Sequence, residues 1–346
     1  MSEGVTVKFA VGYRPMDETS FFDHVQSSIG QIAELYFPWP GQSSGRAAIG
    51  VTQGYAYYTM QGMLEDDLRR FHQAGVALDL LFNSNCYGDY ALSQHLENQV
   101  GSIVEHLFEN VAPVAVVTTT SPAIAFIIKK HFPAVKTRAS VNMRIGTVKG
   151  MQYLANLFDE YLVQRDYNRD PEHLARLKVW ADAEGKQLQI LANSGCMRFC
   201  SGQTFHDNLV AHGEAIDEIR RMDDFSAHIC WDYLKDQKNW VSILQNTWIR
   251  PEDLHHYEAM FPVVKLATRM HPFPNLVIQA YSNGVWRHNL LDLMEPGYSG
   301  AVYPYIFDNT KFPADWYEQV TRCDKNCDAC SYCSQVLEDV LTKLEL

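Results

Sequence analysis

Eight short apolar segments, each able to form a β-strand, alternate with helix-like segments along this chain. Most are continuous runs rich in Val, Leu and Ile, as expected for strands that are covered on both faces. Eight strands alternating with helices predict a (β/α)8 barrel of the TIM type. An open doubly wound sheet is the alternative, but no strand is followed by a GxGxxG turn. The expected strands are residues 7–12, 33–38, 77–83, 114–119, 137–142, 160–164, 187–192 and 263–268.

Several helices have clear start signals. Ser121-Pro122 and Asp170-Pro171 each combine a capping side chain with proline at the first helical position. Arg250-Pro251 is followed by two acidic residues, which stabilise the first turn of a helix. We therefore expect helices to begin at residues 122, 171 and 251, the second of them ending at Gly185.

Two loops are longer than such a barrel needs. Residues 39–56 follow the second strand, and residues 193–250 follow the seventh. Loops after the strands build the active site in this fold, so long ones there are functional candidates. We expect residues 1–320 to form the barrel and residues 321–346 to form a C-terminal cysteine-rich metal-binding segment with a helix.

The charge balance excludes some classes of partner. Lys and Arg number 29 and Asp and Glu number 41, so the net charge is −12, a poor match to a nucleic-acid backbone. No apolar run approaches the ~20 residues that cross a bilayer, and the first residues do not resemble a signal peptide. We expect a soluble cytoplasmic protein, in which eight cysteines favour metal or redox chemistry over disulfides.

The last four cysteines lie close together, in the pattern C-x3-C-x2-C-x2-C. Thiolates at such intervals can surround one zinc ion or one iron–sulfur cluster. Zinc sites usually consist of two well-separated C-x2-C pairs, so the dense spacing favours a cluster. Radical S-adenosylmethionine enzymes share the C-x3-C-x2-C spacing, but there it follows the first barrel strand. The predicted ligands here are Cys323, Cys327, Cys330 and Cys333.

The other four cysteines are scattered in the sequence but all follow predicted strands. Cys86 lies after the third strand, Cys196 and Cys200 follow the seventh, and Cys230 lies in the same long loop. All four should emerge at the C-terminal mouth of the barrel, where they could bind a second cluster. A buried apolar thiol is the alternative, above all for Cys86.

Other polar residues at the expected mouth are candidates for substrate binding and catalysis. The arginines could hold a carboxylate or phosphate, or pair with a nearby acid. The histidines could donate protons, bind metal or hydrogen-bond a cluster sulfur, or one of them could anchor the loop. The candidates for substrate binding are Arg46, Asn83, Asn142 and Asn193, and those for catalysis are His206, His212, Arg144 and Arg269.

The segment from Asn193 to Cys200, with His206 and His212 after it, resembles the signature region of the peptidase U32 family. The segments WIRPEDL (248–254) and KLATR (265–269) and the terminal cysteine group also resemble it, so the likeness covers nearly the whole chain. It implies an iron–sulfur enzyme that supports oxygen-independent hydroxylation, with a prephenate-like oxygen donor. It also implies that some members work as paired barrel proteins.

The chain departs from those relatives in one respect. They carry two further cysteines shortly before the C-x3-C pair, whereas the corresponding stretch here has none. The ligands at the mouth must therefore include other residues, such as Cys230 and Cys86. Otherwise the mouth has no complete cluster and the C-terminal group binds the only one.

We therefore expect an iron–sulfur oxidoreductase, one that catalyses oxygen-independent hydroxylation or a related redox reaction. Its substrate would be a small anionic or aromatic metabolite, and its cofactor one or two [4Fe–4S] clusters per chain. One alternative is a U32-type peptidase with a Cys200–His206 dyad, although no G-x-S-x-G or HExxH motif supports a hydrolase. The other is a metal-stapled, non-catalytic partner of a related barrel protein.

Overall fold

The computed structural model describes residues 7–16, 19–46, 57–213, 216 and 222–345. Eight parallel strands form one sheet in the order β7-β6-β5-β4-β3-β2-β1-β8. The predicted (β/α)8 barrel is confirmed, and every strand overlaps its predicted segment. The strands are β1 (Lys8–Gly12), β2 (Ile32–Pro38), β3 (Ala77–Phe82), β4 (Val116–Thr119), β5 (Lys136–Ala139), β6 (Glu160–Leu162), β7 (Gln187–Gln189) and β8 (Val263–Lys265).

The two edge strands of this sheet meet just beyond the end of β7. Leu191 forms a parallel bridge with Lys265, and the Lys265 N–H donates to the Ile190 carbonyl at 2.9 Å. The Ala192 N–H donates back to the Lys265 carbonyl at 3.0 Å. These bonds connect β7 to β8 and close the sheet into a barrel.

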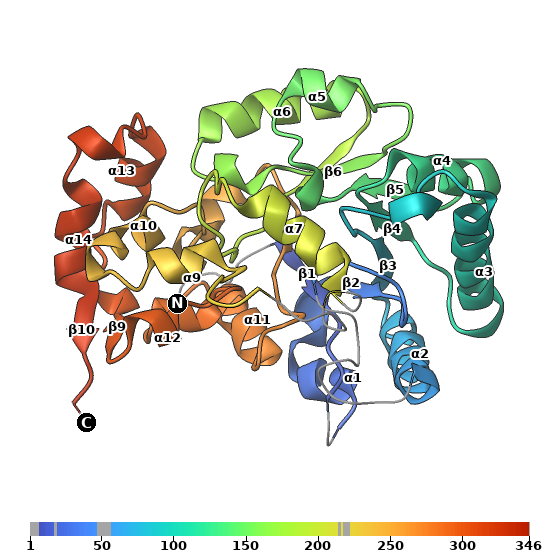
Figure 1. Cartoon of the computed structure of the whole chain (residues 1–346), viewed down its shortest axis with the longest axis horizontal. Helices are drawn as coiled ribbons and strands as arrows, with labels where there is room; N and C mark the ends of the chain where they lie inside the picture. Colours follow the sequence, from blue (N-terminus) through green and yellow to red (C-terminus); the bar gives the residue numbers. More distant parts are fainter. Residues whose placement is uncertain (1–6, 17–18, 47–56, 214–215, 217–221, 346) are drawn as a thin grey trace.

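Helices surround the barrel and continue along the loops (Figure 1). The α-helices are α1 (Phe21–Val25), α2 (Tyr57–Gln73), α3 (Gln94–Asn110), α4 (Pro122–His131), α5 (Val148–Gln152), α6 (Pro171–Ala183), α7 (Gln203–Ala211), α9 (Ile229–Tyr233), α10 (Val241–Leu244), α11 (Pro274–Asn283), α12 (Ser299–Val302), α13 (Trp316–Arg322) and α14 (Tyr332–Val340). The 3₁₀-helices are η1 (Gln26–Gln31), η2 (Gly88–Tyr90), η3 (Val141–Met143), η4 (Arg165–Tyr167), η5 (Gln237–Asn239), η6 (Pro251–Tyr257), η7 (Leu290–Leu293), η8 (Asn309–Lys311) and η9 (Cys327–Ala329).

Two of the three predicted helix starts match α-helices. The Ser121 side chain accepts from the backbone N–H of Ile124 at the start of α4, and Asp170 accepts from His173 at the start of α6. The third, at residue 251, begins the 3₁₀-helix η6 instead, and its Arg250 side chain pairs with the Asp253 carboxylate and accepts no hydrogen bond from the backbone N–H groups of the first turn. Without such a bond the N-terminal N–H groups are not fixed in an α-helical start.

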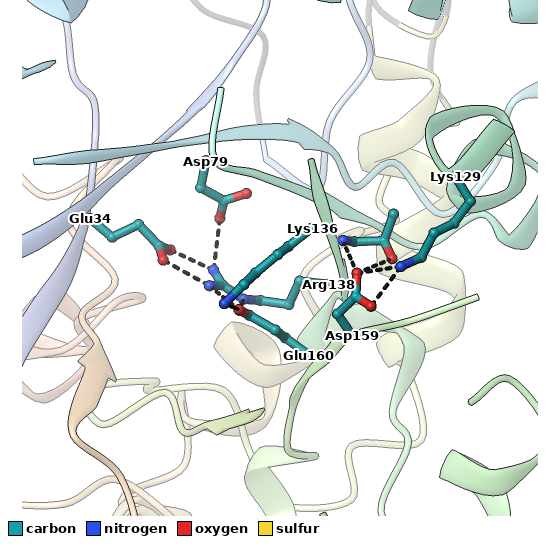
Figure 2. Close-up of polar contacts among 8 residues, drawn as sticks. Glu34, Asp79, Lys129, Lys136, Arg138, Asp159 and Glu160 are labelled. Atoms are coloured by element: carbon teal, nitrogen blue, oxygen red, sulfur yellow. Dashed lines mark hydrogen bonds and ion pairs between the residues drawn. The ribbon is translucent and has the colours of Figure 1, made fainter. Parts of the chain in front are cut away.

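The interior of the barrel contains a buried charged network (Figure 2). The Arg138 guanidinium on β5 donates to both carboxylate oxygens of Glu34 on β2, to Asp79 on β3 at 3.2 Å and to Glu160 on β6 at 2.8 Å. Lys265 on β8 lies above the ring of a buried tyrosine. Strand side chains alternate, so these residues point inward while their apolar neighbours pack against the helices.

The C-terminal segment adds a small antiparallel sheet beside the barrel. β10 (Leu341–Lys343) pairs with β9 (Tyr305–Phe307), so residues beyond 320 pair with residues before it. Helices α13 and α14 lie at one end of the molecule, and the last four cysteines lie on and between them (Figure 1). Among the helices described, none has the length and apolar character to span a bilayer.

Candidate functional site

A cavity of about 960 Å³ opens where the strands end at their carboxyl termini. Its walls come from the loop after β7, from helices α7 and α9, from the segment after β8 and from residues 286–299. The loop predicted to be functional thus supplies much of the wall. Apolar side chains, among them Met197, Trp231 and Met294, line it beside charged ones.

Three of the four cysteines predicted at the mouth line this cavity. Cys196 and Cys200 come from the loop after β7, and Cys230 comes from α9. Burial raises the pKa of the Cys230 thiol, and the neighbouring Cys196 and Cys200 raise it further. Burial is the largest cause that raises the pKa of the Tyr298 hydroxyl, and the same three thiols raise it further. The four side chains therefore form one electrostatically coupled group.

The loop that carries Cys196 and Cys200 is held from two sides. The Gly195 N–H donates to the Glu295 carbonyl at 3.0 Å, and a Cβ at Gly195 would collide with the Pro296 carbonyl. On the other side the Phe199 N–H donates to the Asp166 carboxylate at 2.5 Å, with Phe199 in the left-handed region at φ 47°. Such a conformation costs energy in a non-glycine residue, and the surrounding contacts enforce it.

Cys86 does not line the cavity. Its Sγ accepts from the backbone N–H of Gly88 at 3.4 Å. The adjacent Asn85 nevertheless reaches the mouth, because its side-chain amide donates to Asp207 at 3.2 Å. Three of the predicted mouth thiols thus converge, and the fourth lies outside their cavity.

His206 lines the cavity, whereas His212 ends α7 with its side chain exposed. Burial lowers the pKa of His206, and His228, whose ring centre lies 5.0 Å away, lowers it further. His206 is therefore neutral at pH 7. Within the described residues no hydrogen bond joins a cysteine to a histidine. The sequence did not single out His228, although it lines the same wall.

The three predicted arginines differ in their partners. Arg46 donates to Glu295 at 3.1 Å. Arg144 lies 3.5 Å from Asp207, with a second contact to a threonine hydroxyl. Arg269 is buried, and within the part of the chain that the structure describes none of its guanidinium nitrogens has a hydrogen-bond partner.

Sequence reasoning missed Arg165, at the start of η4. It lines the cavity, is 4% exposed, and its buried Nε has no hydrogen-bond partner in residues 7–16, 19–46, 57–213, 216 and 222–345. Its position just after β6, at the carboxyl end of a barrel strand, was the available signal.

The three predicted asparagines hold backbone in place. The Asn193 side-chain oxygen accepts from the Ala267 N–H, and its amide nitrogen donates to the carbonyls of Ala267 and Leu293. Both ends of this side chain are therefore occupied by backbone groups. The Asn83 side chain accepts from the Gly45 N–H at 3.0 Å, and Asn142 donates to the Asn83 carbonyl at 3.4 Å. These bonds tie the loop after β2 to the ends of β3 and β5.

The C-terminal cysteines form a second, more exposed group. Cys323, Cys327 and Cys330 are exposed and Cys333 is half-buried. Burial raises the pKa of Cys333 to about 11, and its three neighbouring thiols add to this shift. Burial raises the pKa of the Cys327 thiol, whereas the positive charge of Arg198 lowers it. Arg198 lies between Cys196 and Cys200, so this group borders the mouth loop.

Both groups of cysteines offer thiols as possible metal ligands. In the part of the chain that the structure describes, no three His, Cys, Asp or Glu side chains are arranged to hold one metal ion. In a four-iron cluster each thiolate binds a different iron, so the sulfurs stand further apart than the ligands of one ion.

No protein-family model matches the chain. An uncharacterized protease of Methanocaldococcus jannaschii is 24% identical over 273 residues, which are 77% of this chain and 77% of that protein. The solved structure of a U32 peptidase has a TM-score of 0.53 and 13% identity, covering 77% of this chain and 94% of that one. These findings confirm the resemblance to the peptidase U32 family, and the structural likeness extends to the barrel fold.

Proposed function

We propose that this chain is an iron–sulfur oxidoreductase that acts on a small substrate in the cavity at the barrel mouth. The observation that carries the proposal is the convergence of Cys196, Cys200 and Cys230 on one wall of that cavity. These three thiolates would hold a [4Fe–4S] cluster and leave its fourth position to another ligand. A cluster bound there supplies one-electron transfer.

The chain's own side chains would bind and protonate the substrate. Met197, Trp231 and Met294 give part of the cavity lining an apolar surface that excludes water. His206, neutral at pH 7, can accept a proton and return it, and the Tyr298 hydroxyl beside Cys230, which burial keeps protonated, can donate a hydrogen bond. The family resemblance adds oxygen-independent hydroxylation, with a prephenate-like oxygen donor, as the reaction within this proposal.

A U32-type hydrolase is the second candidate, and the comparisons support it more directly than they support redox chemistry. The matched relatives are named a protease and a peptidase. Against it stands the cavity itself, where three thiols cluster and no cysteine is bonded to a histidine among the described residues. A cysteine nucleophile needs an adjacent base to become reactive.

The C-terminal cysteines enter the proposal as a second cluster site or as a zinc staple. Their exposure suits electron exchange with a partner, and a related barrel protein is the partner that the resemblance implies. Metal stapling of a non-catalytic subunit would use the same four thiols, so metal identity separates the two roles.

The test compares cysteine variants after reconstitution with iron and sulfide without oxygen. Cys196→Ser and Cys230→Ser should each lose about four irons per chain and the visible absorbance that goes with them. Cys86→Ser is the matched control and should keep both, because Cys86 lies outside the cavity. Unchanged iron in both cavity variants, or peptide hydrolysis that persists in the iron-free wild-type protein, would overturn the proposal in favour of the hydrolase.

A further inference from the structure

Two arginines at the barrel mouth are buried without a partner for their charge. Arg269 is 7% exposed, and none of its three guanidinium nitrogens has a hydrogen-bond partner among the described residues. Arg165 is 4% exposed and forms no ion pair with a described residue. A guanidinium has five N–H donors, and burying it without partners lowers the stability of the folded state. Such a cost is typical of a residue kept for a ligand.

The carboxylates near Arg269 are already engaged. Glu295 accepts from Arg46 at 3.1 Å and from the Met270 N–H at 3.3 Å. Burial lowers the pKa of Arg269 to about 10, and the nearby Arg46 lowers it further, so the group stays charged at pH 7. Arg46 and Glu295 both line the cavity, which places Arg269 just behind this wall.

The carboxylates near Arg165 are engaged as well. Asp207 lies 3.5 Å from Arg144 and accepts from the Asn85 amide. Asp166 accepts from the Phe199 N–H and from the Gln164 side chain. Arg165, which lines the cavity, therefore offers its donors to whatever enters it.

Arg46 connects the two unpaired arginines. It lies within electrostatic range of Arg269 on one side and of Asp207, the neighbour of Arg165, on the other. Arg46 and Arg165 thus bring positive charge to a lining that also holds Asp207, Asp292 and Glu295 and is otherwise largely apolar.

We propose that the cavity binds an oxyanion, a carboxylate or a phosphate, carried by a small molecule with an apolar body. Arg165 contacts the oxyanion directly, and Arg269 adds an unpaired positive charge behind the wall. The apolar body lies against Met197, Trp231 and Met294. The inference shares its cavity with the proposed function and names the class of substrate, but it needs no cluster to be present.

The test measures binding to metal-free protein by calorimetric titration with three probes that share a phenyl ring. Phenylacetate and phenyl phosphate carry the two kinds of oxyanion, and phenylacetamide is the neutral counterpart. The wild-type protein should bind one or both anions in preference to the amide, and the preferred anion identifies the acidic group. Equal binding of all three probes, or no saturable binding of either anion, would overturn the inference.

Variants then assign the roles. Arg165→Gln should weaken binding of the preferred anion at least about tenfold. The matched control is Arg176→Gln, which removes the same charge on α6, outside the cavity. Unchanged affinity in Arg165→Gln would contradict the assignment. Iron content, measured separately, tests the proposed function, so either idea can fail without the other.

For Arg269, the melting temperature and the anion affinity of one variant together distinguish a ligand-binding role from a structural role. Arg269→Met removes an unpaired buried charge but keeps the volume, so the metal-free variant should melt a few degrees above the wild type. The same variant should bind the anion several-fold more weakly. A lower melting temperature would mean that the protein itself pairs Arg269, and would contradict its assignment to the ligand.

Discussion

Asp79 illustrates how one side chain inside the barrel responds to its surroundings. Its Oδ2 accepts from the Thr118 hydroxyl at 2.8 Å and from Arg138, whereas its Oδ1 has no partner. Burial raises the pKa of Asp79 to about 7, the nearby Glu34 carboxylate raises it, and Arg138 opposes the shift. Near neutral pH the network therefore holds a proton that the unfolded chain would release (Figure 2).

This proton makes the contribution of Asp79 to stability depend on pH. Between about pH 4 and 7 the folded state binds more protons than the unfolded state, so the contribution of this residue falls as pH rises. Asp79→Asn cannot ionise, and its amide oxygen can still accept from Thr118 and Arg138. The variant should therefore gain stability relative to the wild type between pH 5 and pH 7.5, as measured by urea unfolding.

The informative quantity is the difference in unfolding free energy between the wild type and Asp79→Asn. Burial lowers the pKa values of His206 and His256, and these residues titrate in the same pH range in both proteins, so their effect cancels in the difference. If the two unfolding free energies changed in parallel with pH, Asp79 would be ionised in the folded protein throughout this range.

Residue types at the mouth could be predicted from the sequence, but their partners could not. Arg46, Arg144 and Arg269 follow strands in the same way, and only the structure separates the two paired arginines from the unpaired one. The partner of Arg46 is Glu295, 249 residues away. Local sequence carries no signal for such a pair, and for the same reason it did not distinguish Arg165.

At the scale of elements, the strands were predictable because helices cover their outer face. Leu35 and Phe37 of β2 belong to the apolar core, which makes the segment appear as an apolar run. Glu34 and Tyr36 point into the barrel instead. The charged residues inside the strands were the sign of a polar interior, which periodicity alone does not reveal.

Helix starts depend on local chemistry and can be tested locally. Ser121 caps α4 through its hydroxyl, so Ser121→Ala should lower the free energy of unfolding by about 1 kcal/mol. Ser331 occupies the same position before α14 but makes no capping bond, so Ser331→Ala should change it by less than about 0.5 kcal/mol. Equal losses in the two variants, measured by urea unfolding, would show that the cap at Ser121 does not stabilise the helix.

At the scale of the whole molecule, closure of the barrel creates the site. Cys196 and Cys230 are far apart in sequence and share a wall only because the loop after β7 folds back through α7 and α9 over the strand ends. The sequence placed both cysteines at the mouth through the rule that loops after strands face it. It could not exclude Cys86 from the cavity, because that depends on how the loop after β3 turns.

The molecule carries two separate groups of thiols, three in the cavity and four in the C-terminal segment. The cavity group lies inside the barrel mouth and the C-terminal group lies beside it, bordering the same loop through Arg198. Under the proposed function the cavity group holds a cluster, and the C-terminal group holds a second cluster or a zinc ion.

The most direct test is the iron and inorganic sulfide content of the full chain, purified and handled without oxygen. Two four-iron clusters would give about eight irons and about eight sulfides per chain, and a single cavity cluster about four of each. The account predicts one of these two values, with Cys196→Ser lower by about four irons. Zinc or no metal in place of iron, even after reconstitution with iron and sulfide, would contradict it.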